Sequence, residues 1–361
     1  MSKKVEKWGV NRSWNPDHKK VRLADAVPLE TPFLVYVDPA NICNFKCRFC
    51  PTGHPKLLKE VNRPAKIMEF SLFEKILDDL SRFPNKVRAM FFHKDGEPLL
   101  NPRLGEMMTM AVQRGVAEKY WLTTNASLLT PQWAEKIVSS GIDAVRLSIA
   151  HVNSEGYREL TQTCSDYDGV LKGVAALFEE RERQGSKMYI AAKLIDFDFS
   201  PAQLDKFSHD FSDITDDLLL TEPNAWTHND VHDFTLGVKP KAGYDGVMPL
   251  MPDRIACINP FYNLAVNVDG QVGLCPLDWS LSTIVGDVRS ESLYDIWHGR
   301  RAREFQVLQL SGRRHDNPAC KNCECIPYAP ESELDPDRER LLEKFYNILN
   351  KYSNVSSRKG S

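Results

Sequence analysis

Short apolar runs, separated by stretches with helical spacing, repeat along the chain from Thr31 to about Thr221. Apolar runs of this length bounded by polar turns are typical of buried β-strands. The predicted strands are Phe33–Val37, Val87–His93, Tyr120–Thr123, Ala144–Ile149, Met188–Ile195 and Leu218–Thr221. Strands that alternate with helices predict parallel β-α units. Six such units are too few for a closed eight-unit barrel, so the pattern predicts an α/β fold with an open, partial (β/α)6 barrel of the TIM type.

The stretches between these strands carry the start and stop signals of helices. Ser71-Leu72-Phe73-Glu74 matches a capping box, which predicts that a helix begins there and runs to about Leu80. Thr130 and Pro131 have the residue types favoured at the N-cap and first helical position, and Gly141 is expected to end that helix. The other predicted helices are Leu104–Arg114, Tyr167–Glu182 and Pro201–His209.

The pattern changes near Met248, where a smaller second domain is expected. Alternating residues Leu264–Val268, the turn Asp269-Gly270 and the run Val272–Cys275 predict a β-hairpin. The segment Leu293–Trp297 predicts a helix. The chain thus divides into an N-terminal extension (1–30), the partial barrel (31–235), a small domain with a β-hairpin and a helix (248–330), and a C-terminal helix and tail (331–361).

Composition narrows the classes of function. The 361 residues are 42% hydrophobic and 26% charged, as in ordinary globular proteins, and the net charge is −3 with scattered basic residues. No electrostatic footprint for nucleic acid and no apolar span of the ~20 residues needed to cross a membrane is visible. The first residues lack the apolar core of a signal peptide, so we expect a cytoplasmic location. The nine cysteines then indicate metal binding or catalysis rather than disulfides.

Three cysteines follow directly after the first predicted strand. Cys43, Cys47 and Cys50 have the spacing C-x3-C-x2-C, and three thiolates on one short loop can hold one face of an iron–sulfur cube. The fourth iron would then lack a protein ligand, which leaves a position open for a substrate or cofactor. Zinc or purely structural cysteines are the alternative, although zinc modules usually show two C-x2-C or H-x3-H pairs.

A second group of cysteines lies in the small domain. Cys257, Cys275, Cys320 and Cys323 are spaced C-x17-C, C-x44-C and C-x2-C. Four thiolates brought together from a hairpin and a distal C-x2-C can complete the coordination of a [4Fe–4S] cluster. A four-cysteine zinc site would have the same spacing.

The first cysteine motif resembles that of the radical S-adenosylmethionine (SAM) superfamily, and the resemblance extends from about Thr31 to Pro330. In this family SAM chelates the open iron of a [4Fe–4S] cluster. The segment Phe92–Leu99 is similar to the family's G-G-E-P motif, which implies that Gly96, Glu97 and Pro98 hold the amino group of SAM. Asp95 stands where the family has its first glycine. A surface turn is the alternative interpretation of this segment.

Two further strand ends have counterparts in the family. Thr124 and Asn125 are similar to the T-N-G segment near the ribose and methionyl part of SAM, with Ala126 in place of the glycine. Ser148 stands where the family often contacts the SAM carboxylate. Serine and threonine at a strand end also serve ordinary turns, which is the alternative for both.

The small domain resembles the SPASM/twitch domain of radical SAM enzymes, with enough cysteines for one auxiliary [4Fe–4S] cluster. Its cysteine layout is most similar to that of the aminocyclitol dehydrogenase type known from butirosin biosynthesis. Cys325 is left over and could be an alternative ligand, a hydrogen donor or a bystander. Cys164, just before a helix, is expected to be buried, with a hydrogen-donor role as the alternative.

The resemblance implies a radical oxidoreductase. A 5′-deoxyadenosyl radical formed from SAM would take hydrogen from a sugar-like or aminocyclitol-like substrate. The auxiliary cluster would accept the remaining electron and a proton would be lost, so that a secondary alcohol is dehydrogenated. A one-electron reductant such as flavodoxin or ferredoxin is the implied partner. Alternatives are a radical epimerase with a cysteine hydrogen donor, a peptide-modifying SPASM enzyme, and a non-catalytic iron–sulfur, zinc or electron-transfer protein.

The loop Glu222–His228, after the sixth strand, is rich in polar and aromatic residues. Such a loop could line a pocket for a hydroxylated substrate. A loop that bridges the two domains is the other interpretation.

Overall fold

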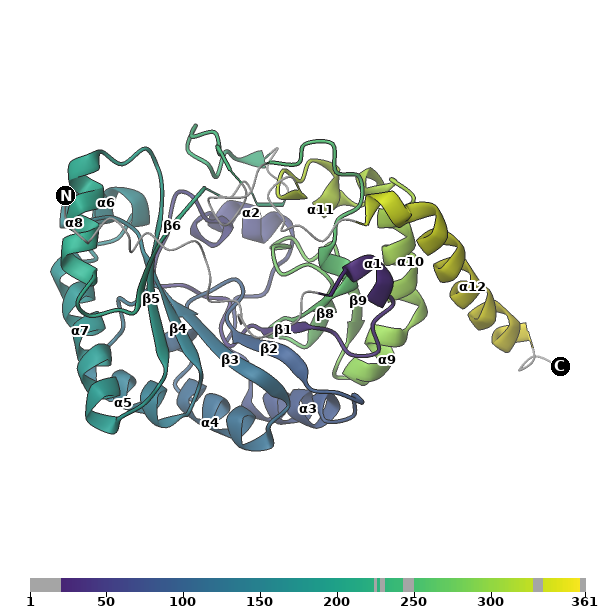
Figure 1. Ribbon diagram of the computed structural model, residues 1–361, viewed down its shortest axis with the longest axis horizontal. Helices are drawn as coiled ribbons and strands as arrows, with labels where there is room; N and C mark the ends of the chain where they lie inside the picture. Colours follow the sequence, from purple (N-terminus) through teal and green to yellow (C-terminus); the bar gives the residue numbers. More distant parts are fainter. Residues whose placement is uncertain (1–20, 224–225, 228–230, 243–249, 327–333, 358–361) are drawn as a thin grey trace.

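The computed structural model describes residues 21–223, 226–227, 231–242, 250–326 and 334–357. A nine-stranded sheet runs through this part of the chain in the order β6-β5-β4-β3-β2-β1-β7-β8-β9 (Figure 1). The first six strands are parallel: β1 Leu34–Val37, β2 Val87–Phe92, β3 Ala117–Thr124, β4 Ala144–Ile149, β5 Tyr189–Ile195 and β6 Asp217–Thr221. The predicted partial barrel with its C-terminal small unit is therefore confirmed.

Five helices alternate with these strands and lie along one side of the sheet (Figure 1). They are α3 Phe70–Leu80, α4 Leu104–Arg114, α5 Pro131–Ser139, α7 Tyr167–Gln184 and α8 Pro201–Phe211. All five were predicted. Two short helices were not predicted, α2 Pro55–Glu60 and α6 Ser154–Thr161, which lie in the connections that follow β1 and β4. A further short helix, α1 Leu23–Ala26, precedes β1.

The predicted capping box at Ser71 is wrong. The helix begins one residue earlier, at Phe70, and Glu69 takes the N-cap position in an extended conformation without a side-chain cap. The Phe70 ring lies under the Arg103 guanidinium, 3.5 Å from ring centroid to carbon, so tertiary packing draws this residue into the helix. At α5 the prediction is confirmed, because Thr130 Oγ1 accepts a hydrogen bond from Trp133 N.

The second unit continues the sheet rather than forming a separate layer. Strands β7 Asn263–Val266 and β8 Gln271–Gly273 form the predicted hairpin, with Gly270 at φ +91° in its turn. Strand β9 Ile284–Asp287 pairs with β8. Because β7 also pairs in parallel with β1, the hairpin is anchored directly beside the strand that leads into the first cysteine loop.

The remaining helices cover the second unit. They are α9 Leu293–His298, α10 Arg300–Leu310, α11 Pro318–Lys321 and α12 Arg338–Ser357. Buried Trp297 ties α9 to the segment before β1, since its indole donates to the Leu29 carbonyl at 2.8 Å. Helix α12 confirms the predicted C-terminal helix and projects from the body of the molecule (Figure 1).

Alternation along the strands separates two environments. One set of side chains, such as Val35, Phe92 and Leu147, packs in the main core with the helices. The opposite set forms a smaller aromatic cluster, in which Tyr36 stacks on Phe91 at 4.6 Å between ring centroids. We call this second face, turned away from the helices, the inner face.

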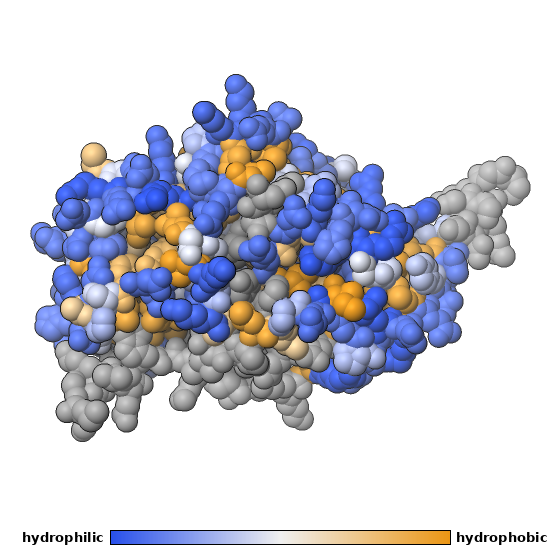
Figure 2. All heavy atoms as spheres, turned by 90° about the horizontal axis from the view of Figure 1, so that it is seen from above, coloured by the Kyte–Doolittle hydropathy of each residue, from blue (hydrophilic) through white to orange (hydrophobic). Residues whose placement is uncertain are grey.

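The coloured part of the face shown in Figure 2 is mostly hydrophilic. Seen from the side on which α2 and α11 lie, apolar side chains are confined to patches between polar ones (Figure 2). Among the described helices, none is both long and apolar enough to cross a membrane.

Candidate metal and cofactor site

The first cysteine group lies on the loop that leaves β1. Cys43, Cys47 and Cys50 are all half-buried. Burial raises the pKa of the Cys43 thiol to about 12, with a further contribution from Glu97. The pKa of Cys47 is raised by burial and then by its two neighbouring cysteines, so the three thiols lie close together. Buried thiols of this kind ionise only when positive charge, such as that of a metal, compensates them.

Two glycines allow the loops around these cysteines to pack closely. A Cβ atom on Gly53 would lie 2.2 Å from the Cys47 carbonyl oxygen, and one on Gly96 would lie 2.1 Å from the Ala40 oxygen. Both distances are below van der Waals contact with backbone atoms, so neither position accepts a side chain without movement. The G-E-P turn after β2 is thereby held against the cysteine loop.

Glu97 joins three segments at this place. Its backbone N–H donates to the Ile42 carbonyl on the cysteine loop at 2.9 Å. Its carboxylate accepts from Thr124 Oγ1 at 2.6 Å and from Asn125 N at 2.8 Å, both at the end of β3. The side chain is buried, which raises the pKa of Glu97 to about 7, while these donors lower it. Its side chain is adjacent to Pro98, which opens a short 3₁₀ turn.

The end of β3 reaches back to the first cysteine. Asn125 Nδ2 donates to Asn44 Oδ1 at 2.9 Å and lies 3.9 Å from Cys43 Sγ. Ser127 closes the network by contacting Asn44 and Asn125. Ala126 has φ +63°, a left-handed conformation that costs ~1 kcal/mol for a residue other than glycine. Glycine would adopt this conformation without that cost, so alanine makes the turn slightly strained.

Asp95, which replaces the other family glycine, takes part in a buried ion-pair cluster. Its carboxylate lies 2.5 Å from Lys94 Nζ and 3.7 Å from Arg63 Nη2. All three side chains are at most 2% exposed. Asp38, at the end of β1, accepts from Asp95 N, and burial followed by the Asp95 charge raises its pKa to about 7. The sequence marked Asp95 as a departure without predicting this cluster.

The second cysteine group gathers five thiols instead of the four predicted. Burial raises the pKa of Cys257 to about 12, with Cys323 as the next contribution, and the pKa of Cys275 and Cys320 is raised in the same way. Cys325 hydrogen-bonds to Cys323, and its pKa is raised by that bond and by burial. Cys325 therefore belongs to this group. Because Cys325 bonds to Cys323, either of these two thiols can be the fourth ligand beside Cys257, Cys275 and Cys320.

The thiols of each group are close enough to influence one another, yet they are not gathered around one point. Within the described ranges, no three Cys, His, Asp or Glu side chains are placed so as to hold a single metal ion. Both groups consist of thiols, the ligands that iron–sulfur clusters require. The donor sets fit iron–sulfur clusters by their chemistry, with three thiols at the first site and at least four at the second.

Residues 226–227 connect the two cysteine groups. Trp226 Nε1 donates to the Phe49 carbonyl at 3.0 Å, and Thr227 Oγ1 donates to the Leu277 carbonyl at 3.0 Å, two residues beyond Cys275. Lys94 Nζ adds a bond to the Asp278 carbonyl at 3.0 Å. Through Trp226 and Thr227 the loop after β6 bridges the two units, which is the second of the two interpretations that its sequence allowed. Residues 224–225 and 228 lie outside the described residues.

The remaining predicted residues are separate. Ser148 is half-buried on the inner face of β4, two residues beyond Arg146. Cys164 is exposed between α6 and α7, so the expectation that it is buried is wrong. It lies in the short connection between these helices. His93 and Arg146, which contact each other on the inner face, were not singled out from the sequence, although Arg146 alternates with Ser148 along β4.

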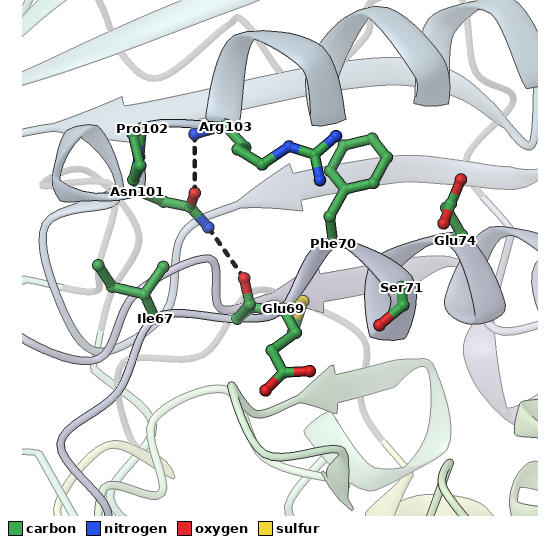
Figure 3. A pocket seen from close by; sticks show the side chains of 9 residues that line it. Ile67, Glu69, Phe70, Ser71, Glu74, Asn101, Pro102 and Arg103 are labelled. Atoms are coloured by element: carbon green, nitrogen blue, oxygen red, sulfur yellow. Dashed lines mark hydrogen bonds between the residues drawn. The ribbon is translucent and has the colours of Figure 1, made fainter.

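An open cleft of about 500 Å³ lies between the starts of α3 and α4. Arg103 lies across the ring of Phe70 there, and the side chain of Asn101 turns toward the chain just before α3, where it donates to the Met68 carbonyl (Figure 3). None of the cysteines or predicted SAM-binding residues lines this cleft. We therefore do not assign it to the cofactor site.

Comparison with known families matches both parts of the chain. The model described as "Radical SAM superfamily" matches residues 37–190, and the SPASM model, described as "Iron-sulfur cluster-binding domain", matches residues 257–324. The first match includes Cys43, Cys47 and Cys50. The second ends one residue before Cys325.

Two curated relatives align over most of this chain. The S-adenosyl-L-methionine-dependent 2-deoxy-scyllo-inosamine dehydrogenase of Niallia circulans is 21% identical, over 84% of this chain and 96% of the relative. A Pyrococcus furiosus protein described as the tungsten-containing aldehyde ferredoxin oxidoreductase cofactor-modifying protein is 23% identical, over 80% of this chain and 86% of the relative.

Solved structures share the fold. BtrN, solved with AdoMet and 2-DOIA, has a TM-score of 0.51 at 18% identity and covers 84% of this chain and 97% of its own. Native anSMEcpe with bound AdoMet has a TM-score of 0.58 at 14% identity and covers 90% of this chain and 100% of its own.

Proposed function

Because this chain is a radical SAM enzyme with a C-terminal SPASM domain, we propose that it dehydrogenates a secondary alcohol on a carbohydrate-like or aminocyclitol-like small molecule. The observation that carries the proposal is the second thiol group. It has enough ligands to coordinate every iron of one auxiliary cluster, so that no iron is left open for a substrate. A closed cluster suits electron transfer. The end-to-end similarity to a SAM-dependent dehydrogenase supports the same conclusion.

In this proposal the two cysteine groups hold the two clusters. Cys43, Cys47 and Cys50 bind the cluster that carries SAM, and the second cluster is bound by Cys257, Cys275, Cys320 and Cys323. The SAM-binding residues are Gly96, Glu97, Pro98, Thr124, Asn125 and Ser148. When bound, these groups would supply one-electron chemistry: SAM is cleaved by an electron from the reductant, a hydrogen atom leaves the substrate carbon for 5′-deoxyadenosine, the hydroxyl proton is lost to a base, and the auxiliary cluster takes up the remaining electron.

The residues of the chain position and enclose these groups. Glu97 fixes the ends of β2 and β3 relative to the cysteine loop, and its carboxylate offers a counter-charge to the ammonium of SAM. The bonds of Trp226 and Thr227 hold the two cysteine groups together and help to exclude water between them. The proposal includes a flavodoxin- or ferredoxin-type reductant and a cytoplasmic setting, where thiols stay reduced.

The test begins with protein purified and reconstituted without oxygen. Iron is counted, SAM and dithionite are added, and 5′-deoxyadenosine is followed beside a variant with Cys43, Cys47 and Cys50 changed to Ala. We expect about eight irons in the wild type and about four in the variant. 5′-Deoxyadenosine should form only in the wild type, and a candidate alcohol should yield its ketone.

Two outcomes would count against the dehydrogenase. About four irons in the wild type, all lost in the variant, would remove the electron acceptor. SAM cleavage with an epimerised instead of an oxidised product would favour the epimerase alternative. The hydrogen bond between Cys325 and Cys323 supports a role for Cys325 among the auxiliary thiols rather than as a separate hydrogen donor.

A further inference from the structure

His93 and Arg146 form a polar site on the inner face, between the aromatic residues and the predicted SAM-binding strand ends. The register places Tyr36, Phe91 and Trp121 in one row across β1, β2 and β3. Thr123 and Arg146 pair in the next row toward the C-terminal ends of the strands. His93 joins that row, because it follows Phe91 by two residues and contacts Thr123 Oγ1 at 3.4 Å.

No carboxylate of the residues described in the structure forms an ion pair with the Arg146 guanidinium. One of its terminal nitrogens, Nη2, lies 3.5 Å from His93 Nε2, and its Nε is buried without a hydrogen-bond partner in the described part of the chain. His93 Nδ1 is likewise buried and unpartnered there. Leaving buried polar nitrogens unsatisfied costs ~1–3 kcal/mol each, and more for a charged group, so a ligand that satisfies both is favoured.

The acidic side chains around this face have other partners. Asp217 accepts the hydroxyl of Tyr189 at 2.9 Å. Asp95 pairs with Lys94 and Arg63, and Asp38 lies beside Asp95. In the described ranges, none of these three acids forms an ion pair with Arg146.

Two cationic side chains, Arg146 and Lys193, lie close enough to influence His93. Burial lowers the pKa of His93 well below its ordinary value, and the charges of Arg146 and Lys193 lower it further. The imidazole is therefore neutral at physiological pH and keeps one N–H donor. Lys193 contributes its charge from β5, where it pairs in register with Ser148.

We propose that Arg146 and His93 bind an anionic group, a phosphate or a carboxylate, of the substrate. A guanidinium matches such groups with paired N–H donors, and the imidazole can supply one more. The half-buried rings of Tyr36 and Trp121 on the adjacent row could contact the apolar face of a sugar-like ring. This inference rests on the proposed function and refines its substrate class to an acidic, hydroxylated small molecule.

SAM also carries a carboxylate, so the experiment must separate the two sources. Anaerobically reconstituted enzyme is titrated calorimetrically with inorganic phosphate at constant ionic strength and, separately, with SAM. The variants are Arg146→Gln, Arg146→Lys and His93→Gln. Arg114→Gln is the matched control, because Arg114, at the end of α4, forms an exposed ion pair with Asp78 of α3. Iron content and circular dichroism are compared for every variant.

We expect phosphate binding in the wild type and the Arg114→Gln control. The phosphate affinity should fall at least about tenfold in Arg146→Gln, which is the effect of losing a charged hydrogen bond. It should fall by less in Arg146→Lys and His93→Gln. The SAM affinity should change less than about twofold, the scatter of a neutral substitution. If Arg146→Gln does not fold, the Arg146→Lys and His93→Gln variants decide the question through the same comparison.

Unchanged phosphate affinity in the Arg146 variants would overturn the inference. A SAM affinity that falls at least as much as the phosphate affinity would overturn it too, and would assign Arg146 to the carboxylate of SAM. Neither readout requires turnover. Failure of the dehydrogenase proposal, seen as no oxidised product, is therefore distinguishable from failure of this one.

Discussion

Replacing Asp95 by Asn tests whether the buried ion-pair cluster stabilises the junction between the two units. The substitution keeps the size of the side chain and removes its charge. Lys94 and Arg63, both 1% exposed, then lose the carboxylate that lies 2.5 and 3.7 Å away. Asparagine can still accept one hydrogen bond, so the change isolates the charge.

The magnitude follows from the surroundings of Asp95. Removing one partner of a buried ion pair costs ~3–5 kcal/mol, because the remaining charge is buried without compensation. Asp38 offsets part of this loss. Its pKa of about 7 is raised partly by the charge of Asp95, so Asp38 ionises more readily in the variant and pairs with the two cations. One pKa unit corresponds to ~1.4 kcal/mol, which leaves an expected loss of ~2–4 kcal/mol in the free energy of unfolding.

Equilibrium urea unfolding of the metal-free protein, followed by circular dichroism, measures this loss. Asp78→Asn is the control, because Asp78 pairs with Arg114 at the surface and should cost less than ~1 kcal/mol. The double variant Lys94→Met, Asp95→Asn should recover ~1–2 kcal/mol, since it no longer buries an uncompensated ammonium. A loss at Asp95 no larger than that at Asp78 would refute the reasoning.

Three other outcomes are expected. Glu97→Gln should weaken SAM binding about tenfold or more in equilibrium dialysis, since a carboxylate that faces an ammonium is lost; unchanged affinity would contradict that role. Because burial raises the pKa of Asp38 to about 7, its ionisation should lower stability as the pH rises from about 4 to 7. Asp38→Asn should flatten this part of the pH profile of thermal unfolding, and an unaltered profile would disprove it. Cys325→Ser should retain the wild-type iron content, whereas Cys320→Ser should lose about four irons; equal losses would make Cys325 a ligand.

Local sequence determined much of the architecture. The strands and the five main helices follow from hydrophobic period and from residues such as Pro131 and Gly141, because these signals act over a few neighbouring residues. The spacing of Cys43, Cys47 and Cys50 on one loop identified the first thiol group for the same reason. The hairpin at Gly270 was equally readable, since its turn needs a residue with positive φ.

Only the tertiary structure determined which other parts of the chain these elements contact. Three features join residues that are far apart in sequence or outside a regular motif. They are the parallel pairing of β7 with β1, the buried charges around Asp95 and the position of Cys325 beside Cys323. The helix start at Phe70 was misjudged because packing under Arg103 outweighs a local capping signal. Long-range pairing, burial and charge compensation depend on the whole fold, so a pattern read over a few residues does not contain them.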